Sequence, residues 1–391
     1  MALFSLAREQ VLDQMSLEKR RCLERRDYEY IHRCVEYECE RSRNDERRRD
    51  DRRCTDERRE RDERRDLVPS RRAVSSPRAA DESFMRQLSA QISQAGDTDG
   101  LLRLAAAHGD HLNHIHTANL WNKLGRQRDT SQPRHREQVE SLLRRTIELL
   151  SSCEERQLAN IVHGLAKTGV HTNEADRLYA AVAGAATRSM SGFNPQNLAN
   201  TAWAFATADV EHPALSAQLK LAITSSLLRA PESWDVAKLS QVHQWQLCLM
   251  LDAGTGSSHA HLLGDELRRR CCDAMQDAAT HPSQLQRSVG AVVDEIHPGF
   301  EQETIEQQTG YSLDLALRSS RVAIEVDGPS HFLRDSSRGE NCPNGPTRLK
   351  RRLLLAADWH LVSVPFYEWD GLNGREAQRE YLKGKLGAVG L

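Results

Sequence analysis

The sequence lacks any apolar run close to the roughly 20 residues that a membrane-spanning helix needs. Its hydrophobic fraction is 39%, whereas 28% of the residues are charged, and basic and acidic groups nearly balance at a formal net charge of −2. No global positive field is therefore available to hold a polyanion, and any nucleic-acid affinity must come from local patches. We expect no membrane span.

The sequence also lacks the motifs of several protein classes. It has nine cysteines but no C-x-x-C pair, so neither a disulfide framework nor a zinc site is indicated, and a reducing compartment is favoured. A glycine-rich nucleotide loop and the H-R-D and D-F-G motifs are missing from the sequence, which excludes a protein kinase.

Charge is concentrated near the N-terminus. Residues 41–66, RSRNDERRRDDRRCTDERRERDERRD, combine 12 arginines with 10 acids. Such a segment buries too little apolar surface to offset its ordering entropy. We predict that residues 1–66 form a charged arm, either helical and solvated or disordered, with binding of a protein partner as the alternative. The stretch 67–83, with its Pro, Ser and Arg residues, is predicted to be a linker.

Residues 84–280 contain a helical repeat. ERQLANIVHGLAKTGVH at 155–171 resembles PQNLANTAWAFATADVEH at 195–212 with an offset of 40 residues, and weaker copies flank the two. A period of about 40 with two helices per unit predicts an α-helical repeat solenoid, which offers a concave surface to a polymer or to a protein partner.

Within the repeats, the leucine and alanine positions are interpreted as packing. Asn160 and Asn200 are candidate RNA contacts, because asparagine is a poor helix former unless its amide is used. Trp203, Phe205 and Trp245 are interpreted as core residues, with stacking on RNA bases as the alternative.

Strands are predicted from residue 283 onward. LQRSVGAVVDEI predicts a helix, FEQETIEQQTG and YSLDLAL a hairpin around Gly310, and RVAIEVDG a central strand covered on both faces. A helix at 346–359, a strand HLVSVPFYEW and a helix GREAQREYLKGKLG follow. We predict a small α/β domain at 283–391, with a mixed sheet flanked by helices.

Acids cluster at the end of the central strand. Period-2 alternation places Glu325 and Asp327 on one face, about 7 Å apart. Asp314 lies on the adjoining strand, and His331 follows the turn. Converging carboxylates suit Mg²⁺ or Mn²⁺, which could activate water for phosphoryl chemistry. Asp314 and Glu325 are the candidate metal ligands, and the candidate catalytic residues are these two with Asp327 and His331. The alternative is that Asp327 opens a turn and that Glu325 pairs with an arginine of the helix at 348–352.

Three motifs in order, IEVDGPSHF, PTRLKRRLL and DWHLVSVPFYEWDGL, together resemble a RAP domain, the C-terminal module of FAST-kinase-like and octotricopeptide-type proteins. The resemblance covers about 310–388, and the helical units in front resemble the repeats of that family. It implies RNA partners and work in mitochondria, with the matrix expected first, or in chloroplasts. A targeting peptide is not legible, because Glu9, Asp13 and Glu18 are unusual in a transit peptide.

The same resemblance implies a fold like that of restriction-endonuclease-like PD-(D/E)xK nucleases. Asp314 takes the place of the first acid and Glu325 that of the second, but Asp327 stands where the motif has lysine. His331 and Lys350 are candidates for the missing proton-handling or cationic group.

Lys350, Arg351 and Arg352 are expected to be phosphate contacts. We therefore expect an RNA-binding factor of organellar gene expression. The alternatives are a non-catalytic scaffold, with arm and solenoid as protein-binding surfaces, and a metal-dependent RNA endonuclease.

Overall fold

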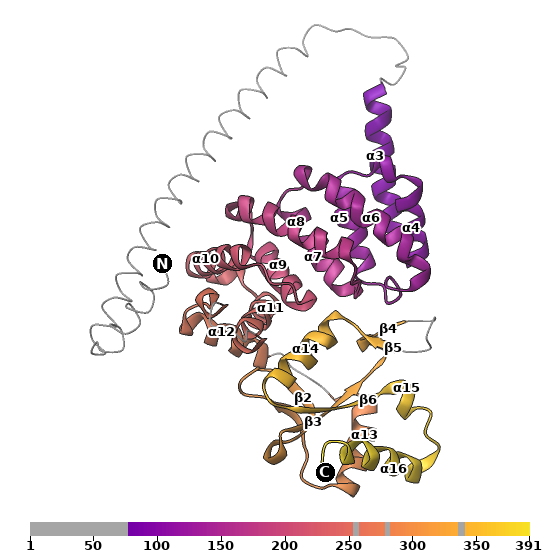
Figure 1. Cartoon of the computed structure of the whole chain (residues 1–391), viewed down its shortest axis with the longest axis vertical. Helices are drawn as coiled ribbons and strands as arrows, with labels where there is room; N and C mark the ends of the chain where they lie inside the picture. The colour runs from indigo at the N-terminus through magenta and orange to yellow at the C-terminus, as the bar shows by residue number, and fades with distance from the viewer. Residues whose placement is uncertain (1–76, 253–257, 278–281, 335–340) are drawn as a thin grey trace, which may run out of the picture. The chain divides into compact units, whose positions relative to one another are not determined.

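The computed structural model describes residues 77–252, 258–277, 282–334 and 341–391, and the part from Ala80 to Leu391 forms one compact unit (Figure 1). The predicted charged arm, residues 1–66, lies outside the described residues, as does the first part of the predicted linker. None of the helices described in these ranges is long and apolar enough to cross a membrane.

The predicted linker does not extend to residue 83, because helix α3 (Pro77–Gln94) begins within it. Proline is tolerated in the first turn of a helix, where its missing N–H has no intrahelical partner. Ala79, Ala80 and Glu82 are good helix formers. The proline therefore marks the start of a helix here, not the middle of a loop.

Paired helices follow with the predicted period. The first helices of the pairs begin at His114, Glu155, Pro195 and Val236, at intervals of 41, 40 and 41 residues, which confirms the α-helical repeat solenoid. The helices are α4 (Thr98–Ala107), α5 (His114–Leu124), α6 (Arg136–Leu149), α7 (Glu155–Thr168), α8 (Asn173–Ser189), α9 (Pro195–Ala208), α10 (Pro213–Arg229), α11 (Val236–Leu247) and α12 (Asp265–Gln276). Short 3-10 turns in this part are Gly109–His111, Pro133–His135, Leu150–Ser152, Met190–Gly192, Pro231–Ser233 and Ser258–His261, with a π-turn at Cys248–Asp252.

Local signals set the helix ends and the spacing of the helices. Side chains that accept a backbone N–H start α5, α8, α9 and α11, namely Asn113, Thr172, Asn194 and Asp235. Gly169, with φ +69°, ends α7 in the left-handed conformation. A Cβ on Gly164 would lie 2.2 Å from Trp121 O, so α5 and α7 can approach this closely only with glycine there.

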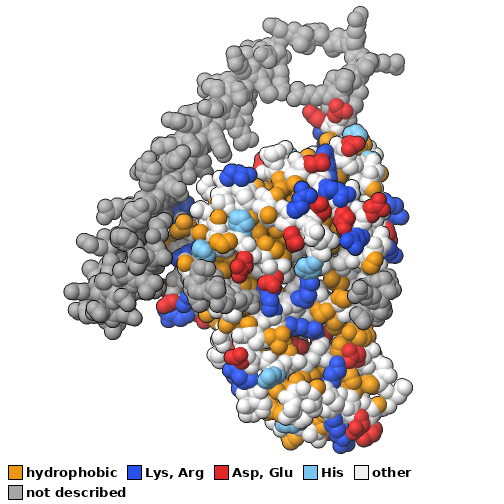
Figure 2. Space-filling view, viewed as in Figure 1, with side chains coloured by type: hydrophobic (Ala, Val, Ile, Leu, Met, Phe, Trp, Pro, Cys, Tyr) orange, Lys and Arg blue, Asp and Glu red, His pale blue; other side chains and the backbone are white. Residues whose placement is uncertain are grey.

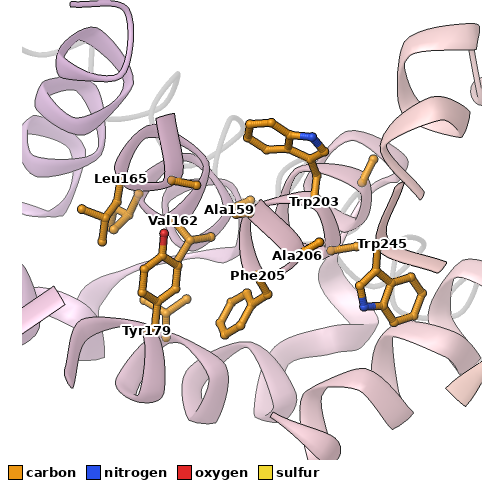
Figure 3. Close-up of a cluster of buried hydrophobic side chains, with 14 of the residues drawn as sticks. Ala159, Val162, Leu165, Tyr179, Trp203, Phe205, Ala206 and Trp245 are labelled. Atoms are coloured by element: carbon orange, nitrogen blue, oxygen red, sulfur yellow. The ribbon is translucent and has the colours of Figure 1, made fainter. Parts of the chain in front are cut away.

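The repeat helices form two rows. α5, α7, α9 and α11 pack side by side, and α6, α8 and α10 form the second row. Figure 3 shows the core between them, where Tyr179 of α8 meets Phe205 of α9 edge to face at 5.3 Å, while Trp203 lies on the other side of α9. Trp203, Phe205 and Trp245 are all buried, as their interpretation as core residues requires.

The C-terminal part is a mixed sheet with helices on both faces, as predicted. Strands β1 (Glu301–Ile305), β2 (Ser312–Leu317), β3 (Val322–Asp327) and β6 (His360–Pro365) lie in the order β1-β2-β3-β6. The first three are antiparallel and β6 is parallel to β3, so β3 is an inner strand, and it is buried throughout. The helices are α13 (Gln284–Ile296), α14 (Gly345–Ala356), α15 (Phe366–Trp369) and α16 (Gly374–Gly387), and 3-10 turns lie at Arg318–Ser320 and Pro329–His331.

Two details differ from the predictions. The predicted strand HLVSVPFYEW ends at Pro365, and its last residues form the short helix α15, because proline has no N–H with which to continue a ladder. The short strands β4 (Phe332–Arg334) and β5 (Asn341–Pro343), which pair with each other, were not predicted. Three residues are too few to show the alternation by which strands are recognised.

The two faces of the sheet belong to different cores. Val322, Ile324 and Val326 of β3 pack in a cluster with residues of α13 and α16. The intervening residues, which include Glu325 and Asp327, face α14. That face shares one buried cluster with the repeats, to which Leu349, Leu353 and Leu354 of α14 belong.

Helix α14 therefore lies between the sheet and the repeats, in contact with α7 and α9 (Figure 1). A Cβ on Gly345, at the start of α14, would lie 2.4 Å from Ala166 O of α7. The two parts thus meet backbone to backbone at this point.

Candidate functional site

A polar cluster lies where the end of β3 faces α14. Lys350 Nζ donates to Glu325 Oε2, and Arg351 Nη2 donates to Asp327 Oδ2 at 2.5 Å. The side chains of Glu325 and Asp327 are 5% and 2% exposed, so both ion pairs are largely removed from water. This arrangement is close to the alternative prediction in which Glu325 pairs with the helix at 348–352, although the partner is a lysine and Asp327 is paired as well.

Asp327 is the most extensively bonded acid of the cluster. Its Oδ2 also accepts from Ser363 Oγ at 2.7 Å, and its Oδ1 lies 3.0 Å from His331 Nδ1. Burial disfavours its charge, but the hydrogen bonds of His331 and Ser363 and the charge of Arg351 outweigh burial and hold the pKa of Asp327 below its ordinary value. Asp327 is therefore a carboxylate at neutral pH, and it orients the His331 ring.

Glu325 is less well satisfied than Asp327. Its Oε2 accepts from Lys350, but its Oε1 is buried without a hydrogen-bond partner. Burial raises the pKa of Glu325 to about 7, against the opposing charge of Lys350. The pKa of Lys350 is raised, because the charges of Glu325 and Asp314 outweigh the effect of its burial. The ammonium also lies 6.0 Å from the centre of the Tyr311 ring.

Asp314 lies beside this cluster, and its hydrogen bonds join neighbouring strands of the sheet and α13. Leu315 pairs with Ile324, and the next pair along would be Asp314 with Glu325. There, Asp314 Oδ2 accepts from Val326 N at 2.7 Å, and Oδ1 accepts from Gln286 Nε2 of α13 at 2.5 Å. Burial raises the pKa of Asp314 even though the charge of Lys350 and these hydrogen bonds oppose it.

The predicted Mg²⁺ or Mn²⁺ site at Asp314 and Glu325 does not fit the residues as they lie. Lys350 Nζ takes the position beside Glu325 that a cation would need, and both Asp314 oxygens already accept hydrogen bonds. Within the described ranges, no group of three or more His, Cys, Asp or Glu side chains is arranged to hold a metal ion. A magnesium or manganese ion would have to displace these partners.

The cluster lines a cavity of about 400 Å³, which we call the acidic cavity. The RAP-side wall includes Glu325, Asp327, Lys350 and Arg351, and Gln244 of α11 contributes to the wall from the repeats. Figure 2 shows Lys and Arg side chains on the visible face where the repeats meet the sheet. The cavity therefore belongs to both parts of the unit.

Residues 324–385, from β3 into α16, match the RAP domain family. The C-terminal part of the chain is a RAP domain. A curated relative, "RAP domain-containing protein, chloroplastic" of Oryza sativa subsp. japonica, is 41% identical over 106 residues, which cover 27% of this chain and 16% of the rice protein. The chain thus spans a small part of that relative's length. The polar cluster lies within the RAP domain apart from Asp314, and the nuclease-like relationship of the fold stays a prediction.

The remaining predicted RNA contacts lie elsewhere. The side chain of Arg352 contacts the repeats. Its Nη2 donates to Ala206 O at 2.6 Å and its guanidinium pairs with Asp209 at 3.2 Å, so Arg352 joins α14 to the repeats. Asn200 is buried, and its Oδ1 accepts from the amides of Gln196 and Gln241. Asn160 is half-buried on α7 and does not lie at the RAP cluster.

Sequence reasoning missed Ser363 and Gln286. Ser363 reaches Asp327 because β6 is parallel to β3 and pairs Ser363 with Glu325, a register that HLVSVP does not reveal. Gln286 is recognisable as the capping-box partner of Ser283, but its bond to Asp314 depends on how α13 packs on the sheet.

Proposed function

We propose that this chain binds RNA in an organelle and acts there in RNA processing, RNA stability, ribosomal RNA maturation or translation. The observation that carries the proposal is the RAP domain at 324–385, a domain associated with RNA binding. The name of the rice relative places that protein in the chloroplast, which supports an organelle for this one. Chloroplast and mitochondrial matrix are distinguished by imaging the tagged chain in cells.

In this proposal the repeats position the transcript and the RAP domain contacts it. The row formed by α5, α7, α9 and α11 provides an extended surface, and solenoids commonly use such a surface for a polymer. The buried core that the two parts share fixes the RAP domain against that row, which supports the proposal that both parts contact the same RNA.

The test is direct binding by the full chain. Fluorescence anisotropy with a labelled single-stranded RNA should show an affinity that falls as salt is raised from about 50 to about 300 mM, with a logarithmic slope of about −0.7 for each phosphate contact. Crosslinking in cells should then recover organelle transcripts. Absence of binding at the lowest salt would sink the proposal.

The scaffold alternative predicts a different outcome. A purely protein-binding chain should show no salt-dependent RNA affinity, and its crosslinked material should be protein alone. The nearly neutral overall charge favours this alternative, because it leaves only local patches for RNA.

Metal-dependent cleavage of RNA is the third hypothesis. Incubation of labelled RNA with the purified chain and Mg²⁺ or Mn²⁺ tests it, with Asp314→Asn as the inactive variant. The ion pairs of Glu325 and Asp327 favour binding without cleavage.

A further inference from the structure

A second cavity of about 620 Å³ lies beside the acidic cavity. The repeats contribute Arg126, Arg128 and Lys167 to its walls, and the RAP domain contributes residues of the turn after β3 and the start of α14. None of the described residues that line it is acidic, and we call it the basic cavity. It shares the wall residues Ser330, Asn344 and Pro346 with the acidic cavity.

Two of the cations occupy equivalent places in successive repeats. Arg126 and Lys167 are 41 residues apart, as are the first residues of α5 and α7. Because α5 and α7 pack side by side, the repeat places the two side chains at corresponding ends of neighbouring helices. Such a pair can contact neighbouring groups along a chain of phosphates.

These cations lack the neutralising acids found in the acidic cavity. Among the described residues, neither Arg126 nor Lys167 forms an ion pair with a carboxylate. Burial lowers the pKa of Lys167 and the charge of Arg126 lowers it further, so the two cations repel each other. Arg128 is oriented by donation to Pro329 O at 2.5 Å. An anion in this cavity would relieve the repulsion.

The acidic cavity offers a complementary feature. Glu325 lines this cavity and is 4% exposed; its Oε2 accepts from the Lys350 ammonium, but its buried Oε1 has no hydrogen-bond partner. A ligand with a hydrogen-bond donor next to an acceptor would satisfy both groups. The pairing edge of every nucleobase has such a donor and acceptor, and in single-stranded RNA that edge is free to be recognised.

Resting on the proposed RNA binding, we propose that single-stranded RNA crosses this junction with its phosphates in the basic cavity, on Arg126 and Lys167, and one base in the acidic cavity, against Glu325 and Lys350. The shared wall of Ser330, Asn344 and Pro346 connects the two positions. Arg126 and Lys167 of the repeats then provide affinity for RNA, and Glu325 of the RAP domain distinguishes between bases.

The phosphate contacts are tested with Arg126→Ala combined with Lys167→Ala in the full chain. Anisotropy with a labelled single-stranded RNA of mixed sequence should show an affinity that falls about tenfold or more and a salt slope that is smaller by about 1 to 1.5. The matched control is Arg144→Ala with Arg188→Ala, which removes two exposed arginines from α6 and α8 and should leave the slope unchanged. Equal slopes for both double variants and the parent chain would overturn the assignment while leaving RNA binding intact. A parent chain that binds no RNA would instead refute the proposed function.

The base contact is tested with Glu325→Gln and four labelled homopolymers of A, C, G and U. Their relative affinities should change severalfold, because the amide presents a donor that the carboxylate lacks, while the salt slope stays the same. Unchanged relative affinities, or a uniform change with all four RNAs, would overturn the base position. As a measurement on the unmutated chain, 4-thiouridine in the RNA should crosslink to His331 or Tyr311 and not to α6 or α8; the reverse pattern would also overturn it.

Discussion

The acidic and basic cavities share three wall residues and differ in how their charges are balanced. In the acidic cavity, Lys350 and Arg351 each pair with a buried carboxylate of β3. In the basic cavity, Arg126 and Lys167 have no carboxylate partner among the described residues. The basic motif RLKRR is the more conspicuous in sequence, yet Lys350, Arg351 and Arg352 of this motif are paired within the fold. The scattered cations of the repeats are the ones left for an anion.

The largest effect is expected from breaking a pair in the acidic cavity. Lys350→Ala should leave the buried Glu325 carboxylate without its partner and lower the free energy of unfolding at pH 8, above the pKa of Glu325, by about 3–5 kcal/mol. Urea unfolding measures this loss, which should shrink at pH 5, where Glu325 is protonated. The control is Lys385→Ala, because Lys385 and Glu368 form a more exposed pair at 2.8 Å worth about 1 kcal/mol or less. Equal losses in the two variants would contradict a special role for the buried pair.

The next effect concerns pH. Burial raises the pKa of Glu325 to about 7, so its protonated form stabilises the fold below its unfolded-state pKa, and that stability is lost as pH rises through 7. Glu325→Gln removes this loss. Relative to the parent chain, the variant should therefore gain about 2–3 kcal/mol of unfolding free energy between about pH 5 and 8.

Glu368→Gln is the opposite control for this measurement. Although burial opposes its charge, hydrogen bonds from Lys385 and Tyr381 hold the pKa of Glu368 below its ordinary value. The stability that ionised Glu368 contributes is present at high pH and lost as pH falls. The free energy of unfolding of the Gln variant should therefore decrease relative to the parent chain as pH rises. If both variants followed the same trend, the assignment to Glu325 would fail.

A somewhat smaller effect is expected from disturbing the wall that the cavities share. Gly345 lies between Asn344 and Pro346, and a Cβ there would lie 2.4 Å from Ala166 O. Gly345→Ala should lower the unfolding free energy by about 1–3 kcal/mol through overpacking and weaken RNA binding as well. Gly384→Ala, on α16 with open space around it, should be neutral or slightly stabilising. Thermal unfolding of the two variants measures both changes, and only Gly345→Ala should lower the unfolding temperature.

The smallest effect on stability is expected from removing the two cations of the basic cavity. Arg126→Ala with Lys167→Ala should change the unfolding free energy by no more than about 0.5 kcal/mol, because no acid loses a partner and one repulsion is relieved. Urea unfolding at pH 7 measures it. A loss comparable to that of Lys350→Ala would show that these cations hold the fold, which would remove the contrast between the cavities.

Periodicity made much of this structure predictable. The 40-residue offset of Asn160 and Asn200 predicted the repeats, and alternation along VAIEVD placed Glu325 and Asp327 on one face of an inner strand. The side-chain contacts between distant segments were harder to predict from the sequence. Whether Glu325 met a metal, an arginine or Lys350 depended on the rotation of α14 against the sheet, which local sequence does not specify. Arg126 and Lys167 carried a usable signal, since their offset of 41 matches that of the repeats, but their lack of acids is a property of packing.

Helix α14 belongs to the RAP domain in sequence, yet Leu349, Leu353 and Leu354 of this helix are buried in one core with the repeats. This has a consequence for how such proteins can be recombined. A RAP domain transplanted alone would expose that leucine face, and one joined to foreign repeats would meet an unmatched surface. The unit that evolution or a protein engineer can exchange is therefore α14 together with the facing surfaces of α7 and α9. Changes at Gly345 and Ala166 should then be inherited as a pair.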